Sequence, residues 1–100
     1  MAIVIVQGVF VLHPGERDRF VEMSAEAMRT SRQEAGCLEY VIAADPLDPE
    51  RVVLSERWSS MDHLQRHLAR PQDPDRAGSR PAPHSVEITL FEVATSRPLR

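Results

Sequence analysis

Along the chain, the pattern of apolar residues changes between one typical of strands and one typical of helices. Each change indicates a new element of secondary structure. Apolar and β-branched residues dominate 3–12, which predicts a strand. Over 16–34 the apolar positions instead recur at helical spacing and gather on one side of a 3.6-residue wheel, opposite the charged positions. The sequence therefore predicts a strand followed by an amphipathic helix. The apolar side of that helix comprises Phe20, Val21, Met23, Ser24, Ala27 and Met28.

The middle of the chain carries the signals of a strand hairpin. Gly36 follows the helix and predicts a left-handed cap, a conformation in which glycine has no steric penalty. Strands are predicted over 37–44 and 51–58 from their apolar composition. The intervening 45–50 holds two prolines and two aspartates, which favour a turn.

A second helix is predicted after this hairpin. Ser59 and Asp62 have the spacing of a capping box, so the helix is expected to begin there and to continue to about Ala69. Its apolar stripe comprises Met61, Leu64 and Leu68.

The last part of the chain predicts a loop, a strand and a tail. Residues 70–83 contain four prolines and a glycine and should be irregular. A fourth strand is expected over 85–94, and 95–100 is expected to be a tail. One domain over 1–94 accounts for all predicted elements.

The order of these elements, βαββαβ, is the split βαβ arrangement of ferredoxin-like α+β proteins. The first and second strands are apolar on both faces. Two helices can cover only one face of a four-stranded sheet, and no residues remain to cover the other. A second copy of the chain is the simplest cover, so a homodimer is predicted.

Composition excludes several classes of function. The chain has 100 residues and a formal net charge of −3, which argues against nucleic acid as a partner. The single Cys37 cannot form an internal disulfide and is predicted to be a small buried hydrophobe. No apolar run is long enough to span a bilayer, and no signal peptide is expected. The predicted location is cytoplasmic, away from membranes.

Candidate chemistry gathers where the third strand meets the second helix. Trp58 ends that strand, and Glu56 lies two positions earlier on the same face. His67 flanks the apolar stripe of the helix, so its ring can point toward Trp58. A neutral histidine there can accept a proton or hydrogen-bond a phenol. The alternative is a core tryptophan beside a half-buried histidine that is satisfied by the backbone.

Other site types lack their sequence signals. His63 and His67 lie four positions apart on a helix, but no third metal ligand is evident nearby. There is no phosphate-binding loop, no GxSxG and no dinucleotide fingerprint. Neither a metal nor a cofactor is predicted.

Three short motifs follow one another along the chain: Gly36-Cys37 with Tyr40, Glu56-Arg57-Trp58, and Leu64-Gln65-Arg66-His67-Leu68. In this order and spacing they resemble the antibiotic biosynthesis monooxygenase (ABM) family, and its quinol-type members most closely. The resemblance implies a dimeric α/β barrel. It also implies a cofactor-independent oxidoreductase that oxidises a small aromatic, of quinol or anthrone type, with molecular oxygen. Anthrone-oxidising relatives carry Asn and Tyr where this chain has Leu54 and Leu64.

The resemblance also implies roles for individual residues. His67 is expected to accept the phenolic proton, Trp58 to form an aromatic wall, and Glu56 to orient His67 or hold the subunit interface. A non-catalytic small-molecule-binding or dimerisation module of the same fold is the competing hypothesis. The expected pocket lining comprises Tyr40, Phe20 and Leu64.

Overall fold

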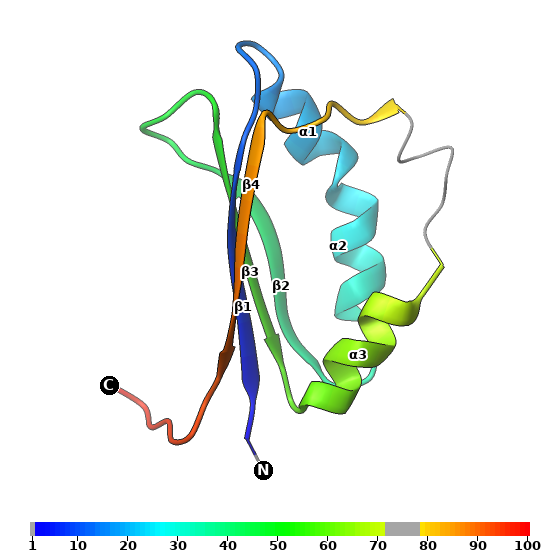
Figure 1. Ribbon diagram of the computed structural model, residues 1–100, viewed down its shortest axis with the longest axis vertical. Coiled ribbons are helices and arrows are strands. Elements are labelled where there is room, and N and C mark those ends of the chain that lie inside the picture. Colours follow the sequence, from blue (N-terminus) through cyan, green and yellow to red (C-terminus); the bar gives the residue numbers. More distant parts are fainter. Residues whose placement is uncertain (1, 72–78) are drawn as a thin grey trace.

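The computed structural model describes residues 2–71 and 79–100, in which one antiparallel sheet carries all the helices on a single face (Figure 1). The strand order is β2-β3-β1-β4. This topology confirms the predicted ferredoxin-like α+β class. The elements are β1 (Val4–Val11), α1 (Arg17–Met23), α2 (Ala25–Arg32), β2 (Cys37–Ala44), β3 (Arg51–Trp58), α3 (Met61–Ala69) and β4 (Ser85–Glu92).

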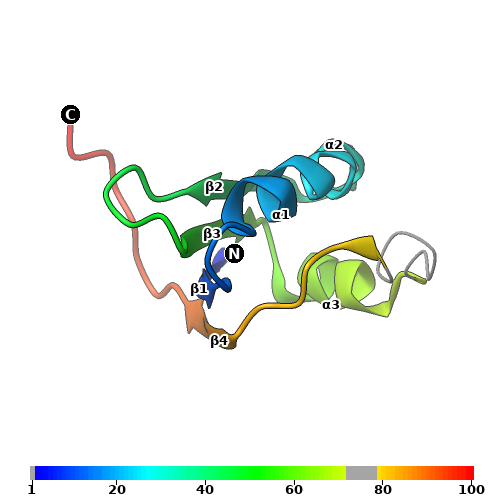
Figure 2. The same ribbon diagram turned by 90° about the horizontal axis from the view of Figure 1, so that it is seen from above.

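The register of the strands decides which side chains form the core. Val6 is paired with Glu56 of β3 and with Leu90 of β4, so these three side chains share the face that carries the helices. Seen from above, α1 and α2 lie over β2, and α3 contacts β3 (Figure 2). The buried core comprises Val4, Val6, Leu12, Phe20, Ile42, Val52, Leu54, Trp58 and Leu64.

The helix predicted over 16–34 is divided at Ser24 into α1 and α2, which corrects the sequence prediction. The Ser24 hydroxyl is fully buried and donates a hydrogen bond of 2.7 Å to the Phe20 carbonyl. Such bonds to the carbonyl four residues earlier are often found where a helix bends.

Two details of the second predicted helix were wrong. Ser60, not Ser59, is the N-cap of α3, and its Oγ accepts from the His63 backbone N–H at 3.3 Å. Leu68 is 70% exposed and is not part of the apolar stripe. His67 takes that place on the inward side of α3, together with Met61 and Leu64.

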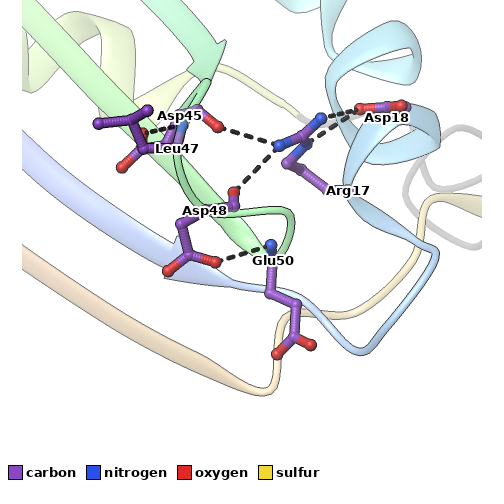
Figure 3. A network of polar contacts seen from close by, with 6 residues as sticks. All are labelled: Arg17, Asp18, Asp45, Leu47, Asp48 and Glu50. Carbon is purple, nitrogen blue, oxygen red and sulfur yellow. Dashed lines mark hydrogen bonds and ion pairs between the residues drawn. The ribbon is translucent and has the colours of Figure 1, made fainter.

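The predicted turn between the second and third strands is confirmed, and Arg17 ties it to α1 (Figure 3). Arg17 Nη1 donates to the backbone carbonyls of Asp45 and Asp48, each at 3.0 Å. The Asp45 carboxylate accepts from the Leu47 backbone N–H at 2.9 Å and pairs with Arg51, and these two contacts lower the Asp45 pKa. The hairpin is thereby fixed against the start of the first helix.

The strand predictions hold closely. The bounds 37–44 and 51–58 are confirmed, whereas the first and last strands are each two residues shorter than predicted. Part of the predicted irregular segment, 72–78, lies outside the described residues. No helix within 2–71 or 79–100 has both the length and the apolar content needed to cross a membrane.

The face of the sheet away from the helices is only partly buried within one chain. Val9, Val53 and Ala43 lie side by side at its centre on adjacent strands, and each is partly exposed. The homodimer predicted to cover this face stays a prediction.

Candidate functional site

Trp58 and Glu56 form the buried base of the candidate site. Residues two apart on a strand point to the same face, and here both point toward the helices. Trp58 is fully buried, Glu56 is 6% exposed, and the indole Nε1–H donates to Glu56 Oε1 at 2.9 Å. The polar edge of the indole is therefore satisfied inside the core by a carboxylate.

His67 reaches this pair from α3, as the sequence predicted. Its ring centroid lies 4.8 Å from that of Trp58 and 5.4 Å from that of Tyr40. Tyr40 comes from β2, where it is paired with Glu56 of β3. The structure thus brings Tyr40, Glu56, Trp58 and His67 together from two strands and a helix.

Sequence reasoning missed two residues of the site: Glu34, which bonds His67, and Arg70, which pairs with Glu34. Glu34, just after α2, accepts a hydrogen bond of 2.8 Å from His67 Nδ1 through Oε2. Its other oxygen, Oε1, pairs with Arg70 Nη1 at the end of α3. One sequence signal existed, because a carboxylate at a helix C-terminus is opposed by the helix macrodipole and needs a cationic partner.

These contacts bear on the expected role of Glu56 in orienting His67, whereas its expected role at a subunit interface stays a prediction. Glu34, not Glu56, is the carboxylate that bonds the His67 imidazole. Glu56 instead accepts from Trp58 and lies on the helix side of the sheet, away from the face predicted to bind a second copy. Glu56 remains close enough to His67 to interact with it electrostatically.

Burial is the main cause of the pKa shifts in this part of the protein. It raises the pKa of Glu56, while the Trp58 hydrogen bond and the nearby His67 act in the opposite direction. Burial and the Glu56 charge raise the pKa of Tyr40, which therefore keeps its phenolic proton at neutral pH. Burial also raises the pKa of Cys37, so its thiol is a poor nucleophile.

Phe20 and Leu64, predicted as pocket lining, are buried core residues. The ring of Phe20 lies 5.4 Å from that of Phe10, and the Arg80 guanidinium sits 4.6 Å from its centroid.

Ser31, which the sequence did not indicate, is fully buried near Tyr40. Its hydroxyl meets hydrogen-bond geometry with no group in the described part of the chain.

A surface cavity of about 460 Å³ opens beside this group, where the end of α2 faces α3. His67, Glu34 and Arg70 are among its lining residues, with His63 and Arg66. Across residues 2–71 and 79–100, no three His, Cys, Asp or Glu side chains converge as a metal site requires. The prediction that the protein binds no metal or cofactor stays open.

The imidazole of His67 is placed to exchange a proton beside two aromatic rings. Because Nδ1 of His67 is bonded to Glu34, Nε2 is the ring nitrogen left to accept a proton. Trp58 and Tyr40 pack beside the imidazole, but Trp58 is fully buried, and neither residue lines the cavity.

Comparison with protein families gives one match over most of the chain. Residues 3–72 match the family described as "Antibiotic biosynthesis monooxygenase". An uncharacterised protein of Synechocystis sp. is 24% identical, and the aligned region covers 96% of this chain and 67% of that protein.

Solved structures share the fold. A provisionally assigned antibiotic biosynthesis monooxygenase from Deinococcus radiodurans superposes with a TM-score of 0.83 at 21% identity, covering 97% of this chain and 98% of that one. SnoaB, a cofactor-independent oxygenase from Streptomyces nogalater, gives a TM-score of 0.78 at 19% identity, covering 98% of this chain and 99% of SnoaB.

Proposed function

Because the chain belongs to the antibiotic biosynthesis monooxygenase family, we propose that it is a cofactor-independent monooxygenase. Its substrate in this proposal is a small electron-rich aromatic of quinol or anthrone type, and its oxidant is molecular oxygen. The likeness in fold to SnoaB, a cofactor-independent oxygenase, supports this choice of chemistry. The observation that carries the proposal is the contact of His67 with both Trp58 and Glu34.

The chemistry requires little from the protein beyond a shaped site and a proton acceptor. His67 Nε2 takes the proton of a phenolic hydroxyl, and the resulting phenolate is rich enough in electrons to reduce oxygen directly. For a hydroquinone, one O2 is consumed, one oxygen atom enters the ring, and the other leaves as water. The four electrons needed to reduce O2 come from the ring, whose product is a hydroxyquinone.

The residues around His67 have supporting roles in this proton transfer. Trp58 offers an aromatic wall at 4.8 Å from His67, centroid to centroid. Tyr40 stays protonated, so its hydroxyl can donate to a substrate oxygen. Glu56 keeps the indole of Trp58 in place through its hydrogen bond.

Oxygen uptake tests the proposal. The purified protein is mixed with a panel of hydroquinones and anthrones in buffer freed of metals by a chelator. We expect saturable uptake that depends on the protein, in preparations that are colourless and lack stoichiometric iron, zinc, flavin or haem. Tight binding of these compounds without turnover contradicts the enzyme and supports the competing binding module.

Two substitutions separate catalysis from packing. His67→Ala should lower turnover by roughly 10²-fold or more, the usual scale for a general base, with a smaller effect on the melting temperature. Trp58→Ala should lower both, because truncation of a buried aromatic costs about 3–5 kcal/mol. Gln65→Ala, at an exposed position of the same helix, is the matched control. Unchanged turnover in a folded His67→Ala protein removes His67 from the mechanism.

A further inference from the structure

We infer that Glu34 is a positioning residue that fixes the tautomer of His67, so that Nε2 is the proton acceptor, and that Arg70 holds the Glu34 carboxylate in place. Nothing in the sequence motifs assigned Glu34 a role. The inference rests on the proposed function for its catalytic meaning, and its structural content can be measured without turnover.

The hydrogen bond between Glu34 and His67 indicates which ring nitrogen carries the proton. Glu34 Oε2 and His67 Nδ1 lie 2.8 Å apart. An ionised carboxylate has acceptors and no donor, so the shared proton belongs to Nδ1. A neutral imidazole carries one proton, which leaves Nε2 with a free lone pair. An imidazole without such a partner favours the opposite tautomer, with its proton on Nε2.

Arg70 holds the other side of the Glu34 carboxylate. Its Nη1 pairs with Oε1, so the two carboxylate oxygens have separate partners, His67 on α3 and Arg70 just after α3. A guanidinium that contacts one oxygen limits the rotation of the carboxylate. The side chains of Glu34 and His67 are only 21% and 11% exposed, so solvent screens this group little.

The turn that carries Glu34 has backbone hydrogen bonds that do not involve its side chain. The turn after α2 is made by backbone groups: the Glu34 N–H donates to the Ser31 carbonyl at 3.1 Å, and the Cys37 N–H donates to the Glu34 carbonyl at 3.2 Å. Glu34→Gln preserves both bonds and nearly all the volume of the side chain. It removes only the charge and the acceptor-only character of the group.

The tautomer is measured first, on the wild-type protein. Nitrogen-15 NMR of the imidazole at about pH 8, above the range in which histidines ordinarily titrate, distinguishes a protonated from an unprotonated ring nitrogen. We expect the proton of His67 on Nδ1. A proton on Nε2 overturns the inference, and this result requires no variant to fold.

Glu34→Gln provides the second test. An amide can either donate or accept, so it no longer selects one tautomer, and the Nε2–H form should gain population. We expect kcat to fall by about tenfold to 100-fold, the scale of one hydrogen bond to a charged group, with little change in KM. Glu34→Asp keeps the charge and should retain the wild-type tautomer. Glu22→Gln, exposed on α1, controls for the lost charge.

These results separate the inference from the proposed function. If His67→Ala lowers turnover while Glu34→Gln changes neither the tautomer nor kcat, the inference fails and the proposed function stands. If His67→Ala leaves turnover intact while Glu34→Gln shifts the tautomer, the proposed function fails and the positioning of His67 by Glu34 stands.

Discussion

Burial and hydrogen bonding shift the pKa of the Glu56 carboxyl group in opposite directions. Burial is the larger effect and raises the pKa above its ordinary value of 4.5, whereas the Trp58 indole N–H and His67 lower it. The folded protein therefore holds the Glu56 proton more tightly than the unfolded chain does. By linkage, folding is favoured most when Glu56 is protonated.

This balance predicts how stability depends on pH. From pH 4.5 up to the raised pKa of the folded protein, the unfolded chain releases its proton first, so the stability contributed by Glu56 falls as pH rises. Glu56→Gln removes this dependence and keeps an oxygen for the Trp58 indole. The melting temperature of Glu56→Gln minus that of the wild type should therefore increase between about pH 4 and 7.

Thermal melts across this range check the prediction, with Glu22→Gln as the control for the loss of one exposed charge. A melting-temperature difference that stays flat or decreases with pH contradicts it.

The sequence predicted a residue of the site only where the spacing within a single strand or helix decides which way the side chain points. Two-residue spacing on β3 put Glu56 beside Trp58, and the helical repeat of α3 turned His67 toward them. The contact between Glu34 and His67 depends on how the end of α2 lies against α3. No pattern within either segment encodes that arrangement, and the position of Glu34 at a helix C-terminus indicates only a cationic partner, not His67.

At the scale of elements, Gly36 is the point where the turn after α2, β2 and α3 meet. Its φ of 81° is in the left-handed region, and its carbonyl accepts from the Ser59 backbone N–H at 2.8 Å. A Cβ at this position would overlap the ring of His63. Glycine is therefore required here both by the backbone conformation and by the closeness of α3.

Gly15 provides a matched comparison, because its φ is 82° and a Cβ there would contact nothing within 4 Å. Gly15→Ala should lower the free energy of unfolding by about 1–2 kcal/mol, the cost of a left-handed non-glycine residue. Gly36→Ala should cost more, because the His63 ring must also move. Chemical denaturation of both variants measures the difference, and equal losses would show that His63 adjusts freely.

The bounds of elements were predictable where local chemistry decides them. The hairpin strands followed from their composition and from the prolines and aspartates of 45–50. The helix break at Ser24 was not predictable, because a serine on the apolar side fits an unbroken helix equally well. Ser59 and Ser60 are both suitable caps by residue type, so the sequence alone does not identify Ser60 as the N-cap of α3.

At the scale of the whole molecule, the helix-free face of the sheet predicts a homodimer that buries roughly 2,000 Å² or more in total. Val53 lies at its centre, between Val9 and Ala43 on the neighbouring strands. Val53→Lys should therefore convert the dimer to a monomer, because a buried unpaired ammonium group is costly. Sedimentation measures the mass.

Gln65→Lys, at an exposed position of α3, adds the same charge away from this face and should leave the dimer intact. A wild-type protein that sediments as a stable 11.3 kDa monomer at micromolar concentration would refute the predicted dimer.

The central position of β1 in the sheet has a consequence for the route of folding. Its two neighbours are β3 and β4, and Val4 is paired both with Trp58 and with Glu92. The β2–β3 hairpin can form from nearby residues, but β1 must wait for partners made much later in synthesis. Pairings between distant segments slow folding, and an unpaired central strand invites association with other chains. During translation, one edge of β1 stays unpaired until β3 is made, and the other until β4 is made.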